Sequence, residues 1–187
     1  MMTDSILEIL RRNENIYNIS HNGNKKLWFS LEKPENLIVG DELLIQEEPI
    51  HLPFGHYTPV NAELFGCMSY WQHLGGRCSS ATACLSISPL QKNEGLVEIV
   101  WIKPNEIGKN GNIMLSTNKE FISSFCKGII KGLQSVVSHP IADIKLTIHG
   151  IIEDTVESNQ MAFLNMGQWI VEALIIEMCK KGIIDRI

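Results

Sequence analysis

Long apolar runs are missing from this chain of 187 residues. A membrane-spanning helix needs about 18 or more consecutive apolar residues, and no stretch approaches that length. The first five residues include an early acid and no basic segment before an apolar run, which is not typical of a secretion signal. We therefore expect a soluble, cytoplasmic protein with no membrane partner.

Paired cysteine motifs are also missing. The five cysteines are odd in number and scattered, at positions Cys67, Cys78, Cys84, Cys126 and Cys179. The absence of any Cys-x-x-Cys pair argues against a disulfide framework and against a zinc knuckle. We expect the cysteines to be reduced and predict no metal site.

Basic residues are too few to coat a surface. Sixteen Lys and Arg stand against twenty-one Asp and Glu, a net charge of −5, which excludes a broad basic surface for non-specific nucleic-acid binding. The phosphate-binding pattern G-x-x-x-x-G-K-[ST] does not occur either. The nearest fragment, residues 108–111, lacks the spacing and the hydroxyl for magnesium. We therefore predict no nucleotide and no other cofactor.

The composition that is present is that of a globular protein, with 44% hydrophobic and 20% charged residues. Residues 1–58 carry five basic and nine acidic side chains, whereas residues 59–187 carry eleven and twelve. Two prolines and a glycine at 53–59 favour an extended connection at this shift. We predict a small β-rich N-terminal module, residues 1–58, and a main domain, residues 59–187.

The N-terminal module is predicted to hold one short helix and two hairpins. Thr3 is a candidate helix cap. Residues 16–20 and 26–31 flank an Asn-Gly pair, a strong hairpin signal. Residues 37–39 and 43–45, split by Gly-Asp, predict a second hairpin. Trp28 and Phe29 are expected to anchor this module to the main domain.

The main domain shows the periodicities of both strands and helices. Apolar and polar residues alternate in several segments, whereas a Thr-Asn-Lys-Glu capping box at 117–120, with Thr117 as the cap, opens an amphipathic helix. The predicted order is strands at 60–72, 81–88 and 96–102, a helix to about 137, a strand at 144–149, and a helix from Ser158 to Gly182. This order indicates an α+β fold with two helices on one sheet face.

Four short motifs carry a family resemblance. They are Gly-Gly-Arg at 75–77, Lys-Gly at 127–128, His-Pro-Ile-Ala-Asp at 139–143 and Val-Glu-Ser-Asn-Gln-Met-Ala-Phe at 156–163. In order and spacing they resemble domain IV of translation elongation factor G and of the tetracycline-type ribosomal protection proteins, over residues 59–182. The resemblance implies the ribosomal protein S5 domain 2-like fold with a left-handed crossover, standing alone without the GTPase domain.

The resemblance also implies a binding surface, because domain IV reaches the ribosomal decoding region through loops at one tip. Carried over to this sequence, the residues that contact the ribosome or its RNA are Gly75, Gly76, Arg77, Cys78, Ser79 and Ser80 in one loop and His149, Asp154 and Thr155 in another. Two glycines allow backbone to approach a partner closely, and Arg77 offers a charged planar group for phosphate or a base. The alternative is a tight hairpin with Arg77 simply solvated.

The same loops depart from the family pattern. Asp154, with Glu153 beside it, stands where the translocase has a histidine, and two carboxylates repel an RNA backbone. Ser79 replaces the family's glutamine, and Ser80 and Ala81 replace its aromatic-glycine pair. The scaffold is therefore expected to match while the ribosome-facing chemistry differs.

Lysines and thiols supply further candidates. Lys119, Lys127 and Lys131 recur at multiples of four on the first helix, which suggests a basic stripe for RNA. The alternative is an ordinary solvated helix face, since useful phosphate binding normally involves more than three contacts.

A nucleophile, base and orienting acid are conceivable from Cys84 or Cys126 with His139 and Asp143. Buried, inert thiols are the favoured interpretation, so we predict no enzyme.

Cys78 is a candidate reactive thiol, because the charge of Arg77 beside it favours the thiolate. His73, His149 and Cys78 are conceivable metal ligands, but nothing in their spacing supports a site.

These observations predict a non-enzymatic, translation-factor-like protein that binds the ribosome or its decoding region. Modulation of translation and protection against an inhibitor are both compatible with it. The alternative is a protein–protein interaction module that kept the domain IV scaffold and lost RNA binding. The acidic N-terminal part and the carboxylates of the second loop favour this alternative.

Overall fold

A computed structural model describes residues 16–18, 25–33, 40–49, 57–92, 94–105, 109–135 and 141–184. Its strands in chain order are β1 (Ile16–Asn18), β2 (Lys25–Ser30), β3 (Gly40–Pro49), β4 (Leu64–Leu74), β5 (Arg77–Pro89), β6 (Leu96–Pro104), β7 (Lys109–Asn110), β8 (Ile113–Leu115) and β9 (Ile144–Asp154). The described helices are α2 (Lys119–Ser135), which follows β8, and α3 (Gln160–Lys181), which follows β9. The short helix predicted after Thr3 lies outside the described residues.

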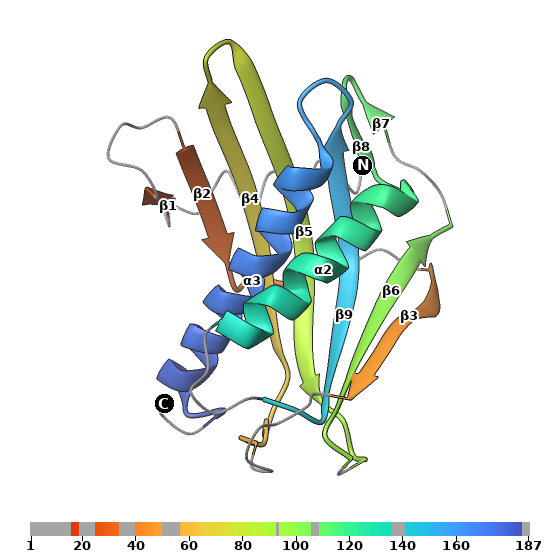
Figure 1. The fold of residues 1–187 in the computed structure, drawn as a ribbon, viewed down its shortest axis with the longest axis vertical. Helices are drawn as coiled ribbons and strands as arrows, with labels where there is room; N and C mark the ends of the chain where they lie inside the picture. The colour runs from red at the N-terminus through yellow and green to blue at the C-terminus, as the bar shows by residue number, and fades with distance from the viewer. Residues whose placement is uncertain are drawn as a thin grey trace.

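One mixed sheet carries the fold, and the strand order along its main path is β1-β2-β4-β5-β9-β6-β3. Neighbours on this path run antiparallel, except for β6 and β9, which run parallel. The β7–β8 hairpin lies off the path, and β8 pairs with the end of β9. Both described helices cover the same face of the sheet (Figure 1). The predicted α+β class, with two helices on one sheet face, is confirmed.

The parallel pairing of β6 with β9 requires a crossover connection, because the chain must return to the end of the sheet where β6 began. That connection runs through α2. In Figure 1 both strands run upward, and the chain passes in front of the sheet from β6 to β9 on its left. This path is left-handed, against the general right-handed rule and in line with what the resemblance implies.

The core between helices and sheet follows the predicted alternation. On β9, Ile144, Leu146 and Ile148 are fully buried in it. The helices supply residues at helical spacing, among them Phe125 and Ile129 of α2. The sequence periodicities therefore identified the correct buried faces of these elements.

Glycines allow α2 and α3 to cross at close range. A Cβ on Gly128 would lie 2.0 Å from the carbonyl oxygen of Leu164, and a Cβ on Gly167 would lie 2.2 Å from that of Phe125. Neither distance is possible without a backbone shift. The Lys-Gly motif at 127–128 therefore serves helix packing through its glycine.

The helix ends are set by local side chains. The Asn118 Oδ1 atom accepts a hydrogen bond from the backbone N–H two residues later (2.9 Å), so the predicted cap at Thr117 is wrong by one residue. At the start of α3, Asn159 Oδ1 accepts from the N–H three residues later (2.9 Å). Gly182 ends α3 with a φ of 68°, as the sequence predicted.

By length and composition alone, α3 is long and apolar enough to cross a membrane. Half of its apolar window is buried inside the protein, against the sheet and α2. The buried core helix of a globular protein has the same composition. The expected absence of a membrane partner stays a prediction.

Strands from the predicted N-terminal module extend the main sheet at both edges. β2 pairs with β4 at one end, and β3 pairs with β6 at the other. The β1–β2 pairing confirms the first predicted hairpin. The second is wrong, because Gly40 and Asp41 lie inside the strand β3 and form no turn. Strands from both sides of the predicted boundary near residue 58 therefore share one sheet.

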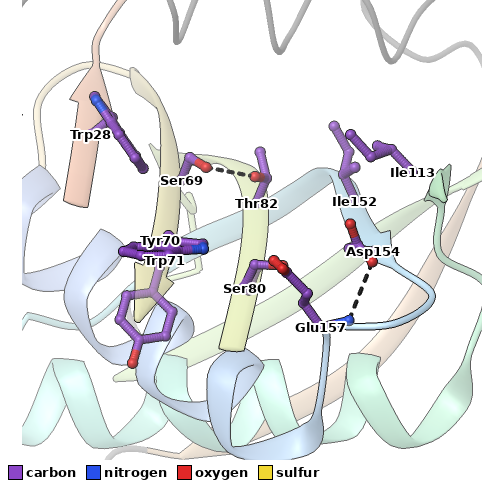
Figure 2. A pocket seen from close by; sticks show the side chains of 11 residues that line it. Trp28, Ser69, Tyr70, Trp71, Ser80, Thr82, Ile113, Ile152, Asp154 and Glu157 are labelled. Atoms are coloured by element: carbon purple, nitrogen blue, oxygen red, sulfur yellow. Dashed lines mark hydrogen bonds between the residues drawn. The ribbon is translucent and has the colours of Figure 1, made fainter. Parts of the chain in front are cut away.

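The two aromatic residues of β2 lie on opposite faces of that sheet. Phe29 is buried in the core under the helices and anchors the N-terminal strands, as predicted. Trp28 is half-buried and points to the face away from the helices (Figure 2). Of these two aromatic residues, Phe29 therefore belongs to the anchoring core, where it lies beside Leu27 of the same strand.

Asp143 ties the β5–β6 loop to the start of β9. Its Oδ1 atom accepts hydrogen bonds from three successive backbone N–H groups, those of residues 94–96, at 2.9 to 3.1 Å. Burial acts to raise the pKa of Asp143, but hydrogen bonds from Tyr57 and from these N–H groups outweigh it, and the pKa lies below its ordinary value. The carboxylate is therefore engaged in holding the loop.

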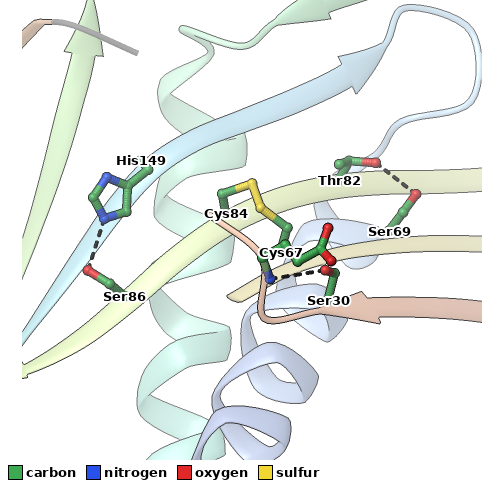
Figure 3. Close-up of a disulfide and its surroundings, with 8 residues drawn as sticks. Ser30, Cys67, Ser69, Thr82, Cys84, Ser86 and His149 are labelled. Atoms are coloured by element: carbon green, nitrogen blue, oxygen red, sulfur yellow. Dashed lines mark hydrogen bonds between the residues drawn. A yellow bond between two sulfur atoms is a disulfide. The ribbon is translucent and has the colours of Figure 1, made fainter. Parts of the chain in front are cut away.

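A second apolar cluster lies on the sheet face away from the helices. Its buried members are Phe65, Cys67, Cys84, Ile102, Leu115 and Ile152. Cys67 and Cys84 stand directly opposite each other on β4 and β5 and form a disulfide (Figure 3). The prediction of reduced cysteines is wrong for this pair, because strand pairing joins two residues that no sequence motif connects.

We expect reduction of the Cys67–Cys84 bond to lower the free energy of unfolding by about 2–4 kcal/mol, because the bond restricts the unfolded chain. Urea unfolding with and without reductant measures the difference. The C67A/C84A double variant is the control and should not respond to reductant. Five titratable thiols in the denatured, unreduced chain, instead of three, would contradict the disulfide.

We expect Asp143→Ala to lower the free energy of unfolding at pH 7 by about 1–3 kcal/mol, because it removes the charged acceptor of three backbone hydrogen bonds. Asp143→Asn keeps an acceptor oxygen and tolerates the positive φ of 54°, so its loss should be smaller. The folded-state pKa is depressed, so this stabilisation is present above about pH 4 and is lost as the pH falls through the folded pKa. A gap between wild type and Asp143→Ala that grows on acidification would contradict this role.

Candidate functional site

Three turns lie at the same end of the sheet, where strands β4, β7 and β9 end, and we call this end the tip. They are the β4–β5 turn, the β7–β8 turn and the β9–α3 loop, and all lie at the upper end of the molecule in Figure 1. The sequence predicted the first and the third of them. The tip is the region that the resemblance marks as a binding surface.

The β4–β5 turn consists of Gly75 and Gly76. Leu74 pairs with Arg77 across it, and the two glycines have φ values of 51° and 90°, a conformation that side-chain-bearing residues rarely adopt. All three residues from 75 to 77 are exposed. A Cβ added to either glycine would have no atom within 4 Å, so backbone and Arg77 are open to a partner.

The next three residues belong to strand β5 and not to a free loop, so the predicted loop 75–80 is shorter than expected. Ser80 donates its N–H to the carbonyl of Glu157 (3.2 Å) and accepts from the Ser158 hydroxyl at its own carbonyl (2.8 Å). Ser79 accepts from the Asn159 amide (2.9 Å). These bonds fasten β5 to the β9–α3 loop.

The Cys78 thiol is less acidic than the sequence suggested. Burial raises its pKa, and the charge of the Glu157 carboxylate and a hydrogen bond to it raise the pKa further. The prediction that Arg77 favours the thiolate is therefore wrong. Glu157 comes from a segment distant in the sequence, so spacing alone did not reveal it.

His149 does not belong to the tip, because β9 continues to Asp154. It is the extra residue of a β-bulge, with Leu85 opposite Ile148 and Cys84 opposite Gly150. The loop therefore begins at residue 155, six residues later than the predicted start at residue 149. No proline or Asn-Gly pair between residues 149 and 154 marks the end of the strand in the sequence.

The His149 ring is half-buried on the face away from the helices (Figure 3). Its Nε2 atom lies 2.9 Å from Ser86 Oγ, and its centroid lies 5.2 Å from that of Phe65. Burial disfavours the charged imidazolium and lowers the pKa of His149 to about 4. The ring is therefore neutral at physiological pH and packs as part of the sheet.

Asp154 holds the β9–α3 loop with its own carboxylate. The Oδ1 atom accepts from the N–H groups of Val156 (2.8 Å) and Glu157 (3.2 Å). Thr155 is exposed, and the Val156 side chain is 75% exposed. The negative charge of Asp154 is thus partly met by backbone dipoles inside the loop, and the loop presents Thr155 and Val156 outward.

The β7–β8 turn was missed as a part of the tip. Asn110 pairs with Ile113, and Gly111 has a φ of 61°. The Thr155 N–H donates to the carbonyl of Asn112 (2.8 Å), which ties this turn to the β9–α3 loop. The sequence signal for this turn is the Asn-Gly pair at 110–111, which is typical of a hairpin.

The three lysines of the predicted stripe are exposed on α2. Lys119 is the first residue of that helix, next to the tip, whereas Lys131 lies three turns further along. Only Lys119 is therefore close to the three turns. The role of the stripe in binding RNA stays a prediction.

The conceivable thiol nucleophiles are not available in this structure. Cys84 is in the disulfide, and burial raises the pKa of the Cys126 thiol to about 12. His139 lies outside the described residues. Asp143, the candidate orienting acid, already binds three backbone N–H groups.

The conceivable metal ligands are not brought together either. His73 and Cys78 are paired across β4 and β5, but His149 lies beside Ser86, eight residues further along β5 and thus about 26 Å away. Within the described stretches, no group of three or more His, Cys, Asp or Glu side chains is placed to hold a metal ion.

The fold of this chain has a relative among solved structures, although no protein-family model and no curated protein matches the sequence. It is similar to a crystal structure of the protein ttk003000868 from Thermus thermophilus, with a TM-score of 0.51 and 14% sequence identity. The similarity covers 66% of this chain but only 17% of that one, so the two share one folded unit within a much longer protein. At this identity the comparison shows a related fold.

We expect Cys78 to react with iodoacetamide more slowly than an unperturbed thiol at pH 8, because its pKa is raised. Glu157→Gln removes the carboxylate charge and should speed the reaction. Peptide mass spectrometry separates Cys78 from Cys179, the other partly exposed thiol, which serves as the internal control. A rate above that of a free thiol would contradict the effect of Glu157.

Proposed function

We propose that this protein is a non-enzymatic, translation-factor-like protein that binds the ribosome in the region of the decoding centre through its tip. The proposal includes a cytoplasmic location and no nucleotide, metal or membrane requirement. It rests on the four-motif resemblance to domain IV, together with the related fold. The single observation that carries it is the exposed Gly75-Gly76-Arg77 turn at the tip.

Arg77 is the main contact in this proposal. A two-glycine turn without nearby atoms lets backbone N–H groups and the guanidinium approach an RNA backbone together. Arginine is permanently charged and binds phosphate through two N–H groups at once. The turn is therefore better suited to a directed contact with one phosphate group than to non-specific electrostatic attraction.

The rigidity of the tip supports the proposal. Hydrogen bonds of 2.8 to 3.2 Å fasten the β9–α3 loop to strand β5 at Ser80 and to the β7–β8 turn at Asn112. A surface that is ordered before binding loses little conformational entropy when it binds. The internal bonds of Asp154 also reduce the repulsion that its charge implies for RNA.

The second candidate is a protein–protein interaction module on the same scaffold. The observation that favours it is the composition of the β9–α3 loop, where an exposed Val156 lies between Asp154 and Glu157. An apolar residue flanked by carboxylates suits a protein surface better than an RNA backbone.

A buried disulfide is unusual in the cytoplasm, where thiols are kept reduced. Cys67 and Cys84 are both 0% exposed, so attacking thiols have poor access to the bond. This burial is compatible with persistence in a reducing compartment.

Co-sedimentation of the purified chain with ribosomes in sucrose gradients tests the proposal. We expect binding at low salt that weakens as salt rises, and Arg77→Ala should weaken it about tenfold, because a charged hydrogen bond is lost. Lys181→Ala is the matched control, because it removes an exposed cation at the opposite end of α3. Its binding should equal that of the wild type.

Absence from the ribosomal fractions at low salt would contradict the proposal. Salt-insensitive binding that Val156→Asp abolishes and Arg77→Ala leaves unchanged would instead support the protein-interaction module. Equal losses for Arg77→Ala and Lys181→Ala would indicate only non-specific attraction to RNA.

A further inference from the structure

A cavity lies on the sheet face away from the helices, below the tip. Its volume is about 380 Å³, at the lower end of the range for small-molecule sites. Its described lining residues are Trp28, Ser69, Tyr70, Trp71, Ser80, Ala81, Thr82, Ile113, Ile152, Asp154 and Glu157. In Figure 2 Trp28, Ser69 and Thr82 point away from the helices, whereas the Tyr70 ring points toward them.

Two indoles form one side of this cavity. Trp28 comes from β2 and Trp71 from β4, and both are half-buried. The Trp71 ring stacks nearly parallel on the His73 ring, at 12° and 6.1 Å, which restricts its orientation. Indoles offer a large apolar surface whose faces carry negative electrostatic potential.

The opposite side carries two carboxylates, those of Asp154 and Glu157. None of the eleven described lining residues is basic. Ser69 and Thr82 on the floor are hydrogen-bonded to each other at 2.9 Å, so their hydroxyls are already partly satisfied. The cavity therefore combines aromatic surface on one side with two carboxylates on the other.

We propose that this cavity binds a small organic cation, a quaternary or protonated amine with apolar substituents. Indole faces attract such cations, and carboxylates add a charge attraction that a neutral ligand does not gain. An anion would be repelled by both sides. The size of the cavity suits a molecule smaller than a typical drug. This inference can hold or fail separately from ribosome binding through Arg77, because the cavity includes neither Arg77 nor the β4–β5 turn.

An NMR titration of the full chain tests the inference, with the four tryptophan indole N–H signals as reporters. The probes are choline and benzyltrimethylammonium, and the control is 3,3-dimethylbutan-1-ol, which has the shape of choline without its charge. We expect the Trp28 and Trp71 signals to shift and saturate with the cations. Trp101 is buried in the core on the other face and should not move. The neutral alcohol should bind about tenfold more weakly than choline.

Charge variants complete the test. Glu157→Gln should weaken choline binding about fivefold and leave the neutral alcohol unchanged, whereas the exposed Glu94→Gln should affect neither. An unshifted Trp101 signal shows that a variant is folded. Trp28→Leu should remove binding of the cations.

Three results would overturn the inference. They are equal affinities for choline and its neutral counterpart, which would indicate a merely apolar cavity; shifts of Trp101 as large as those of Trp28; and no saturable shift with either cation in the millimolar range.

Discussion

The insertion of β9 between β5 and β6 is the interaction on which the remaining structure depends. β9 pairs antiparallel with β5 and β8 and parallel with β6, and most of its residues are buried. Its parallel pairing forces the crossover through α2, and its last residue, Asp154, begins the loop that enters α3. β9 pairs with β5 along its length and with β8 at its end. The three turns of the tip therefore lie at the same end of the sheet.

The sheet is two-sided, and its faces carry different chemistry. The face under the helices is closed by aliphatic and aromatic side chains and by the glycine crossing of α2 and α3. The other face holds the Cys67–Cys84 disulfide, the neutral His149 and the cavity between the indoles and the carboxylates. A largely antiparallel sheet such as this one can carry two different faces, since successive side chains along a strand point to opposite sides. The features with distinctive chemistry therefore gather on the face that the helices leave uncovered.

The scaffold and the binding chemistry of this protein are separable. The related fold is shared with a bacterial protein at 14% identity, and such a scaffold serves many functions. The tip combines an open cationic turn at Arg77 with a loop whose carboxylates are engaged internally or face Cys78. Proposed ribosome binding depends on the first of these elements. The proposed cation site depends on the second, together with indoles from β2 and β4.

By itself, the sequence determined the local structure and the fold class. Alternation placed β5 and β9, helical spacing placed α2 and α3, and Gly182 marked the end of α3, because these signals act over a few residues. It also indicated the turn at Gly75 and Gly76 and the exposure of Arg77. Tertiary structure decided the rest, because it joins residues far apart in the chain. Strand pairing brought Cys67 to Cys84, put β2 and β3 at opposite edges of one sheet, and extended β9 past His149. The contact of the β9–α3 loop with β5 brought Glu157 to Cys78. The cavity, built from five strands and a loop, has no local signal at all.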